Sequence, residues 1–151
     1  MANSPAKRIK VMTFGAFDII HDGHRSLFRQ AKAFGGRNSK LLVVVASDAR
    51  IKKIKGKAPW FSQKERMEHL KKEPLIDQVI GGDRLNTLKP ILEYGPEIIV
   101  FGYDQPLAPE ELDAMLMKKG FFARKIVRAR AYKPHLCKSS IIKQKKGKKY
   151  N

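Results

Sequence analysis

The sequence predicts an α/β fold: a Rossmann-like, doubly wound, parallel five-stranded sheet in a single domain. Two observations predict it. Short apolar runs typical of strands alternate with helical patterns along the chain. The run at residues 41–46, Leu-Leu-Val-Val-Val-Ala, is continuously apolar, as expected of a parallel strand buried on both faces. The 151 residues suffice for one domain with a core, and no internal linker divides them.

The alternation fixes the expected order of the elements. Strands are expected at residues 9–14, 41–46, 76–80, 98–101 and 123–127. Helices are expected at residues 26–34, 62–72, 87–94, 109–120 and 139–146. Residues 49–60, between the second strand and the second helix, are expected to form a basic loop. The first strand, helix and second strand make one βαβ unit, which is normally right-handed.

Capping residues mark the helix ends. Gly35 and Gly36 end the first helix. Ser62 and Glu65 have the spacing of a capping box at the start of the second. Pro109 stands near the first position of its helix and is followed by two glutamates, which suit the positive end of the helix dipole.

Composition excludes several classes of protein. No apolar run approaches the ~20 residues that span a membrane, and the N-terminus has no apolar signal region, so we expect a cytoplasmic protein without a membrane partner. The single cysteine, Cys137, excludes a disulfide framework and a multi-cysteine zinc site. We expect a disordered N-terminus at residues 1–7, the domain at 8–143 and a basic tail at 144–151.

The net charge of +18 is unevenly distributed. Residues 114–151 contain thirteen lysines or arginines and neither aspartate nor glutamate. Such a tail is usually a solvated, mobile end or a nonspecific polyanion contact, and it can also steer phosphorylated substrates.

One stretch carries the clearest chemical signal, and it joins the first strand to the first helix: Phe14-Gly15-Ala16-Phe17-Asp18-Ile19-Ile20-His21-Asp22-Gly23-His24. A strand that ends in a glycine turn before a helix N-terminus suits phosphate binding, because free backbone N–H groups and the helix dipole face the anion. Gly23 allows close approach of the backbone. His21 and His24 can donate to an α-phosphate, and a triphosphate favours their protonated forms. Two incidental loop histidines, or a metal pair, are the alternatives, although zinc lacks further ligands here.

The two halves of this stretch, Gly-x-Phe-Asp and His-x-Gly-His, resemble the signature of the cytidylyltransferase-like nucleotidyltransferases. These enzymes transfer a nucleoside monophosphate from a triphosphate to a phosphate group and release pyrophosphate. The resemblance implies that His21 and His24 are catalytic. It implies nucleotide binding by the same stretch, namely Gly15, Ala16, Phe17, His21, Asp22, Gly23 and His24. Ala16 replaces the usual small polar residue, and Asp18 either caps the turn or binds a metal.

The segment after the second strand, Lys-Gly-Lys-x-Pro followed by Glu-Arg, resembles a second family segment. There a lysine and an arginine hold the triphosphate or the acceptor phosphate. The resemblance assigns these roles to Lys57, also as a catalytic residue, and to Arg66. A solvated basic loop is the alternative.

Two later motifs sort the subfamilies. Gly102-Tyr103-Asp104-Gln105 resembles the archaeal-type FAD synthases, and Asp104 can accept from a ribose hydroxyl or a base amine. Lys138-Ser139-Ser140 resembles the start of the family's C-terminal helix, where Lys138 would contact phosphate and Ser139 and Ser140 the nucleotide. Tyr132 can stack on a base or an isoalloxazine ring. A capped surface helix is the alternative, and Cys137 beside it is either a thiol-sensitive group or an apolar filler.

The resemblance thus implies transfer of AMP from ATP to FMN, giving FAD and pyrophosphate, with a divalent cation, most often Mg²⁺, on the phosphates. ATP and FMN are the expected partners, and relatives are often homodimers. One alternative is a cytidylyltransferase that uses CTP and glycerol 3-phosphate or a related phosphoalcohol. Another is a basic nucleic-acid-binding module, although a pure binder has no need of the two-histidine turn.

Overall fold

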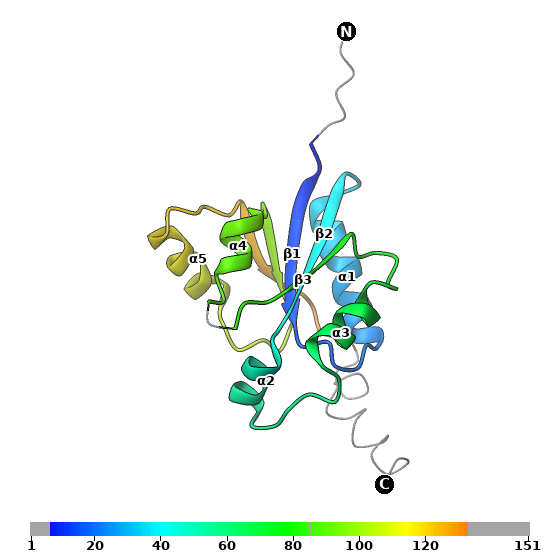
Figure 1. The fold of residues 1–151 in the computed structure, drawn as a ribbon. Coiled ribbons are helices and arrows are strands. Elements are labelled where there is room, and N and C mark those ends of the chain that lie inside the picture. The colour runs from blue at the N-terminus through cyan, green and yellow to red at the C-terminus, as the bar shows by residue number, and fades with distance from the viewer. Residues whose placement is uncertain (1–6, 85, 133–151) are drawn as a thin grey trace.

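A computed structural model describes residues 7–84 and 86–132 and confirms the predicted α/β class (Figure 1). Five parallel strands form one sheet in the order β3-β2-β1-β4-β5. The strands are β1 Ile9–Gly15, β2 Ser39–Val45, β3 Gln78–Gly81, β4 Ile98–Phe101 and β5 Lys125–Arg128. The helices are α1 Asp22–Gly35, α2 Asp48–Lys55, α3 Gln63–Leu70, α4 Lys89–Tyr94 and α5 Pro109–Lys118. The predicted helix at residues 139–146 lies outside the described part of the chain.

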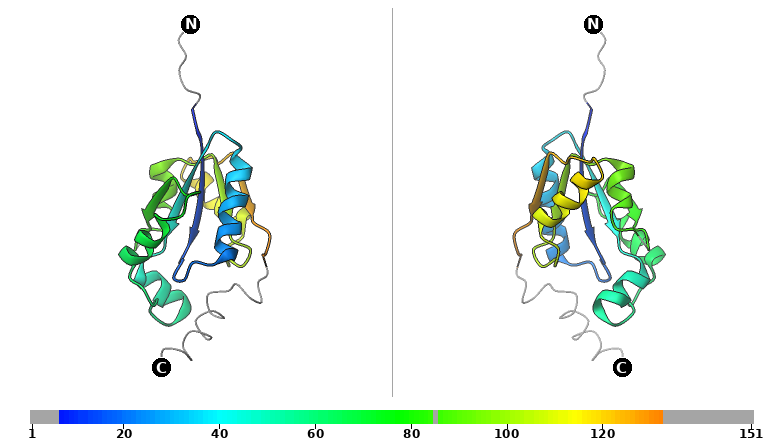
Figure 2. Two further views of the ribbon diagram at one scale, coloured as in Figure 1. Left: turned by 90° about the vertical axis from the view of Figure 1, so that its right-hand side faces the viewer. Right: turned by 90° about the vertical axis from the view of Figure 1, so that its left-hand side faces the viewer.

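Helices cover both faces of the sheet, as a doubly wound fold requires. Helices α1 and α3 lie on one face, and α4 and α5 lie on the other (Figure 2). Successive strand residues point to opposite faces, so Val11 packs with α1 whereas Met12 packs with α4 and α5. The two resulting cores explain why the β2 segment is continuously apolar.

The central strand β1 determines where a ligand can bind. Its neighbours β2 and β4 lie on opposite sides, so the strand order reverses beside it. In open sheets of this kind ligands bind beyond the carboxyl ends of the strands at that reversal. The buried Thr13 hydroxyl ties the two halves together by donating to the Val100 carbonyl at 2.7 Å.

Two predictions differ substantially from the structure, whereas the other described elements begin and end within two residues of their predicted bounds. Helix α1 begins at Asp22 rather than at residue 26, because His21 caps it. The expected basic loop is helical from Asp48 to Lys55, because the Ser47 hydroxyl accepts from the Arg50 amide at the N-terminus and Gly56 adopts a left-handed conformation at the C-terminus. The basic side chains of this segment, such as Arg50 and Lys55, are therefore held on a helix rather than on a loop.

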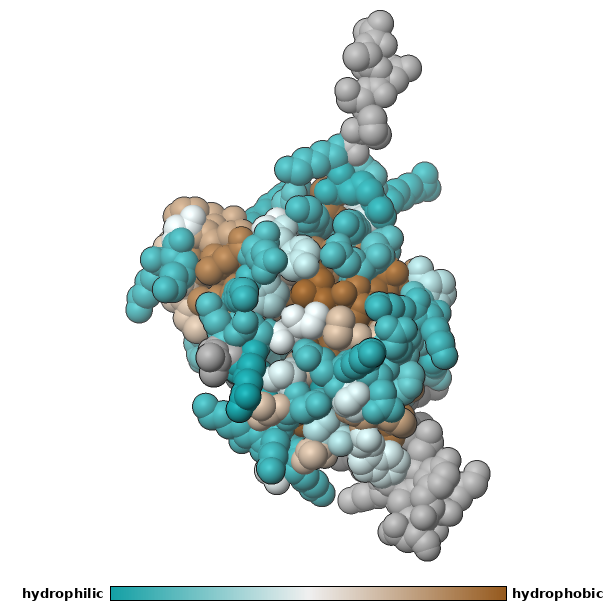
Figure 3. All heavy atoms as spheres, viewed as in Figure 1, coloured by the Kyte–Doolittle hydropathy of each residue, from teal (hydrophilic) through white to brown (hydrophobic). Residues whose placement is uncertain are grey.

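Hydrophilic side chains cover most of the face shown in Figure 3, and apolar side chains gather over α5, where Met115 and Met117 are exposed. Within residues 7–84 and 86–132, none of the helices has the length and apolar character that crossing a bilayer requires.

Gly35 is a packing requirement of this fold. A Cβ there would lie 2.6 Å from both the Ser39 Cβ and a Val11 methyl carbon, and neither of these buried groups can move freely. We expect Gly35→Ala to lower the free energy of unfolding by about 1–3 kcal/mol, as overpacked cores do. Urea unfolding measures this. Gly36→Ala is the contrast, since no atom lies near its Cβ and only its positive φ opposes the change. An unchanged free energy of unfolding in Gly35→Ala would contradict the packing argument.

Candidate active site

His21 forms the N-terminus of α1 with its own side chain. Its Nδ1 accepts a hydrogen bond from the Gly23 amide at 3.1 Å, and its backbone is extended, as at other helix caps. The positive end of the α1 dipole therefore lies beside the imidazole, where it favours an anion.

His24, one turn along α1, completes a reciprocal cap. Its Nδ1 accepts from the His21 amide at 3.4 Å, and the two imidazole rings stack with their centroids 3.8 Å apart. Because Nδ1 is an acceptor in both rings, the proton of each neutral imidazole is on Nε2. Two Nε2–H donors are thus available to a ligand at one point of the cavity wall.

Both histidines are weaker bases than an exposed imidazole, because the pKa of each is lowered. Burial lowers the pKa of His24 from its ordinary value of 6.5 to about 3, and the neighbouring His21 ring and Lys55 act in the same direction. Burial also lowers the pKa of His21, although the Asp22 carboxylate opposes this. In the ligand-free protein both rings are therefore neutral donors at pH 7, and protonation beside a bound triphosphate stays a prediction.

The turn that precedes the histidines has an unusual backbone. Phe17 has a φ of +52°, and it is the one non-glycine residue with positive φ among residues 7–84 and 86–132. Its ring covers Gly15, where a Cβ would lie 2.8 Å from the ring carbons. The same ring contacts His24 edge-on at 5.1 Å between centroids and also packs on Phe28. Gly15 is therefore required by the position of the Phe17 ring.

A cavity of about 560 Å³ opens at the carboxyl ends of the strands, within the size range of small-molecule sites. The predicted site residues that line it are Gly15, Ala16, Phe17, His21, Gly23, His24, Asp104 and Tyr132. Arg130 also lines it. Asp22 does not, because its exposed carboxylate pairs with Arg25 at 3.1 Å. Lys138, Ser139, Ser140 and Cys137 lie outside the described residues.

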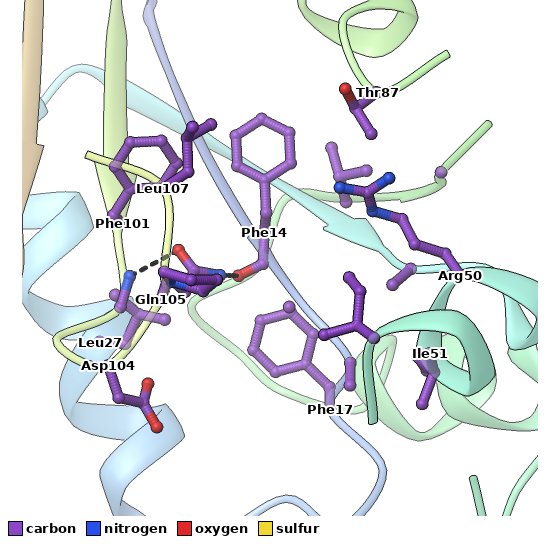
Figure 4. A pocket seen from close by; sticks show the side chains of 18 of the residues that line it. Phe14, Phe17, Leu27, Arg50, Ile51, Thr87, Phe101, Asp104, Gln105 and Leu107 are labelled. Carbon is purple, nitrogen blue, oxygen red and sulfur yellow. Dashed lines mark hydrogen bonds between the residues drawn. The ribbon is translucent and has the colours of Figure 1, made fainter. Parts of the chain in front are cut away.

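Gln105 connects the two turns that form the cavity walls (Figure 4). Its Nε2 donates to the Phe14 carbonyl at 2.6 Å, and its Oε1 accepts from the Gly102 amide at 2.9 Å. The ends of β1 and β4 are thereby held at a fixed separation. The neighbouring Asp104 and Tyr103 line the cavity beside this bridge.

Among residues 7–84 and 86–132, the cations that line the cavity are not the predicted Lys57 and Arg66. Lys57 lies beyond α2 and is exposed, and it is absent from the cavity lining. Arg50 and Lys55 line the cavity instead, and Figure 4 shows the Arg50 side chain extending from α2 toward Thr87. The signal that could have identified them is the pair of caps, Ser47 and Gly56, that encloses α2.

Arg66 is fully buried and absent from the cavity lining, contrary to the predicted phosphate contact. Its guanidinium donates to the Ala16 and Phe61 carbonyls, at 2.8 and 3.0 Å, and to the Asp48 carboxylate at 2.6 Å. These bonds occupy its fork geometry, so it supports the protein chain rather than a ligand.

Asp18 is also structural in this arrangement. Its carboxylate is 2% exposed and accepts from the Trp60 and Phe61 amides, at 2.7 and 2.9 Å. Of the two roles that the sequence left open, capping is the one these contacts fit. Within the described residues, no group of three or more His, Cys, Asp or Glu side chains could hold a metal ion.

Comparison with known proteins agrees with this geometry. The family described as cytidylyltransferase-like matches residues 12–145. The FAD synthase of Methanothermus fervidus is 37% identical over 142 residues, which cover 93% of this chain and 97% of that protein. The FAD synthase of Thermococcus sibiricus is also 37% identical, with 92% and 93% covered.

A solved structure matches as well. It is the crystal structure of a protein described as a lipopolysaccharide core biosynthesis protein from Thermoplasma volcanium, with 35% identity and a TM-score of 0.76. The match covers 83% of this chain and 99% of that one. With most of its length matched in each comparison, the chain belongs to the cytidylyltransferase-like family.

Proposed function

We propose that this protein is a nucleotidyltransferase that moves AMP from ATP to FMN and releases pyrophosphate, which makes it an FAD synthase. The observation that carries the proposal is the stacked histidine pair, with two Nε2–H donors at a helix N-terminus inside the cavity. It occurs in a chain that matches archaeal FAD synthases over more than nine-tenths of its length.

In the proposed reaction an FMN phosphate oxygen attacks the α-phosphorus of ATP in line. The bond from that phosphorus to the oxygen bridging to the β-phosphorus breaks, and pyrophosphate leaves with that oxygen. Phosphoryl chemistry of this kind needs positioning and charge stabilisation rather than covalent catalysis. His21 and His24 supply donors from Nε2, and the positive end of the α1 dipole adds to their effect. No proton has to move, because the attacking phosphate is already an anion.

The apolar part of the cavity favours a flavin acceptor. On the side opposite α1, the lining is aromatic and aliphatic: Phe14, Val44, Leu88, Pro90, Ile91, Phe101, Leu107 and Leu112. Transfer of a planar tricyclic ring from water to such a surface is favourable. Glycerol 3-phosphate has no apolar group to fill this region, so the lining argues against the phosphoalcohol alternative.

A divalent cation fits this site as part of the nucleotide complex. The described residues hold no metal-ligand cluster, and Mg²⁺ commonly binds through substrate phosphates and at most one or two carboxylates. Asp104 and Asp83 are the carboxylates that line the cavity. When bound, the cation supplies neutralisation of the triphosphate charge.

Arg50 and Lys55 are suited to receive the FMN phosphate, because α2 presents both to the cavity. A hydrogen bond to a charged group contributes about 1.5–3 kcal/mol. We therefore expect Arg50→Gln to raise the KM for FMN by about tenfold or more, with a smaller change in kcat. Steady-state kinetics with varied FMN measures this. Lys57→Gln is the matched control outside the cavity lining, and a larger effect there than at Arg50 would contradict the assignment.

The product identifies the reaction. Incubation with ATP, FMN and Mg²⁺ is expected to convert FMN to FAD, detected by chromatography of the flavins. FMN that stays unchanged while CTP and glycerol 3-phosphate react would overturn the proposal in favour of the cytidylyltransferase.

A further inference from the structure

We infer that Asp18 and Arg66 are positioning residues that hold the strained Phe17 turn from both flanks and thereby fix the imidazole of His24. Their effect on turnover rests on the proposed function, whereas their effect on the histidine itself can be measured without substrate.

The Phe17 turn needs external support. A bulky residue in the left-handed region is strained and persists only where the surroundings hold it. The conformation places the Phe17 ring over Gly15 and edge-on to His24. Relaxation of this one residue would withdraw the ring on which His24 packs, and the His24 ring stacks in turn on His21.

Asp18 holds the turn from its carboxyl side. Its two carboxylate oxygens accept from consecutive amides, Trp60 and Phe61, in the loop before α3. A carboxylate can accept both bonds, whereas an amide side chain presents one oxygen and one NH₂ group. The acid is therefore matched to its two donors.

Arg66 holds the turn from its amino side. One of its amino groups donates to the Ala16 carbonyl, the residue immediately before Phe17, and its Nε donates to the Phe61 carbonyl. Phe61 thus has its N–H bound by Asp18 and its C=O bound by Arg66. The residues on either side of Phe17 are therefore both linked to the Phe61 backbone, Asp18 directly and Ala16 through Arg66.

The Arg66 guanidinium also contacts α2, the helix that forms another wall of the cavity. Its remaining amino group donates to Asp48 at 2.6 Å, and Asp48 opens the first turn of α2. Helix α2 carries Arg50 and Lys55 into the cavity. One buried side chain therefore connects the turn beneath the histidine pair with the helix that bears the phosphate-binding cations.

Stability alone is a weak reason for this arrangement. Only Arg66 of the Asp48–Arg66 pair is buried, and burial of a charged side chain is often no more stabilising than well-packed apolar residues of similar volume. Arg66 is nonetheless fully buried, and its acceptors are the turn, the loop and α2 rather than the central core. Arg66 therefore fixes the positions of these three segments relative to one another.

The first test is Asp18→Asn, which preserves volume and loses one of the two bonds. We expect kcat to fall by about tenfold to a hundredfold, because small misplacements of catalytic groups are costly. Nuclear magnetic resonance of the imidazole nitrogens, recorded without substrate, is expected to show the His24 pKa rising from about 3 toward 6.5 as the ring loses its buried position. Arg66→Lys keeps the positive charge but loses the planar guanidinium, so it is expected to lower kcat and raise the His24 pKa as well. It replaces Asp18→Asn as the test if that variant does not fold.

Asp77→Asn is the matched control. Asp77 also accepts from a backbone amide, that of Leu41 at 2.8 Å, but this contact lies at the opposite, amino end of β2. The control is expected to leave the His24 pKa unchanged and kcat within about twofold. A His24 pKa that stays near 3 in both Asp18→Asn and Arg66→Lys would overturn the inference, whether or not the protein makes FAD.

The contact between Arg66 and Asp48 of α2 is tested separately in a double-mutant cycle. Asp48 is half exposed, so Asp48→Ala should fold, and it is expected to raise the KM for FMN several-fold. If the Asp48–Arg66 bond acts by placing Lys55, the effect disappears in a Lys55→Met background. Additive effects of Asp48→Ala and Lys55→Met on the KM for FMN would contradict this role of the Asp48–Arg66 bond.

Discussion

Replacement of His21 with asparagine is expected to lower kcat by two or more orders of magnitude while the fold remains stable. Asparagine is among the preferred helix caps, and its side-chain oxygen can accept from the Gly23 amide as the His21 Nδ1 does. The Nε2–H donor is lost, and one lost charge-stabilising donor costs about 10²–10³ in kcat. Pyrophosphate release and urea unfolding measure the two effects separately.

His21→Ala is the matched variant, because it loses the cap as well as the donor. It is expected to match His21→Asn in kcat and to lose about a further 1 kcal/mol of unfolding free energy. His24→Asn is expected to show a loss of turnover as large as that of His21→Asn. Near-normal turnover in the His21 and His24 variants would remove the histidines from the mechanism.

Acid is expected to destabilise the protein through His24. The unfolded chain binds a proton at this residue below pH 6.5, whereas the folded state does so only near pH 3, so stability falls as pH decreases between these values. At pH 4 the contribution lost is about 3 kcal/mol, at 1.36 kcal/mol for each pH unit below 6.5. Urea unfolding at pH 7 and pH 4 gives the difference.

The control for this prediction is His24→Asn, which cannot take up the proton. Other titrating groups, such as Asp77 with its lowered pKa, are common to both proteins and cancel in the comparison. The variant is therefore expected to lose about 3 kcal/mol less than the wild type on acidification. Equal losses in the two proteins would show that the His24 imidazole is not held neutral by the fold.

The sheet could be predicted because its signals are local. Buried strands such as β2 and β4 are short and apolar, and the α3 capping box lies within four consecutive residues. The apolar pattern does not predict helix α2, because lysines obscure it and only Ile51 is buried within α2. Its caps were the better guide, since they do not depend on a hydrophobic face.

The histidine pair could likewise be predicted, but its support could not. Capping by His21 involves residues two and three positions away, within reach of sequence reasoning. Arg66, by contrast, reaches Ala16 across fifty positions and Gln105 reaches Phe14 across ninety-one. No spacing rule distinguishes an arginine that binds a phosphate from one that binds a distant carbonyl, and the family resemblance alone favoured the first.

The measurement that tests the central claim most directly is pyrophosphate release in the presence of Mg²⁺, with ATP or CTP crossed against FMN or glycerol 3-phosphate, for the wild type and His21→Asn. We predict release only with ATP and FMN, and its loss in the variant. Release with CTP alone, or release from ATP and FMN that His21→Asn leaves intact, would contradict the account.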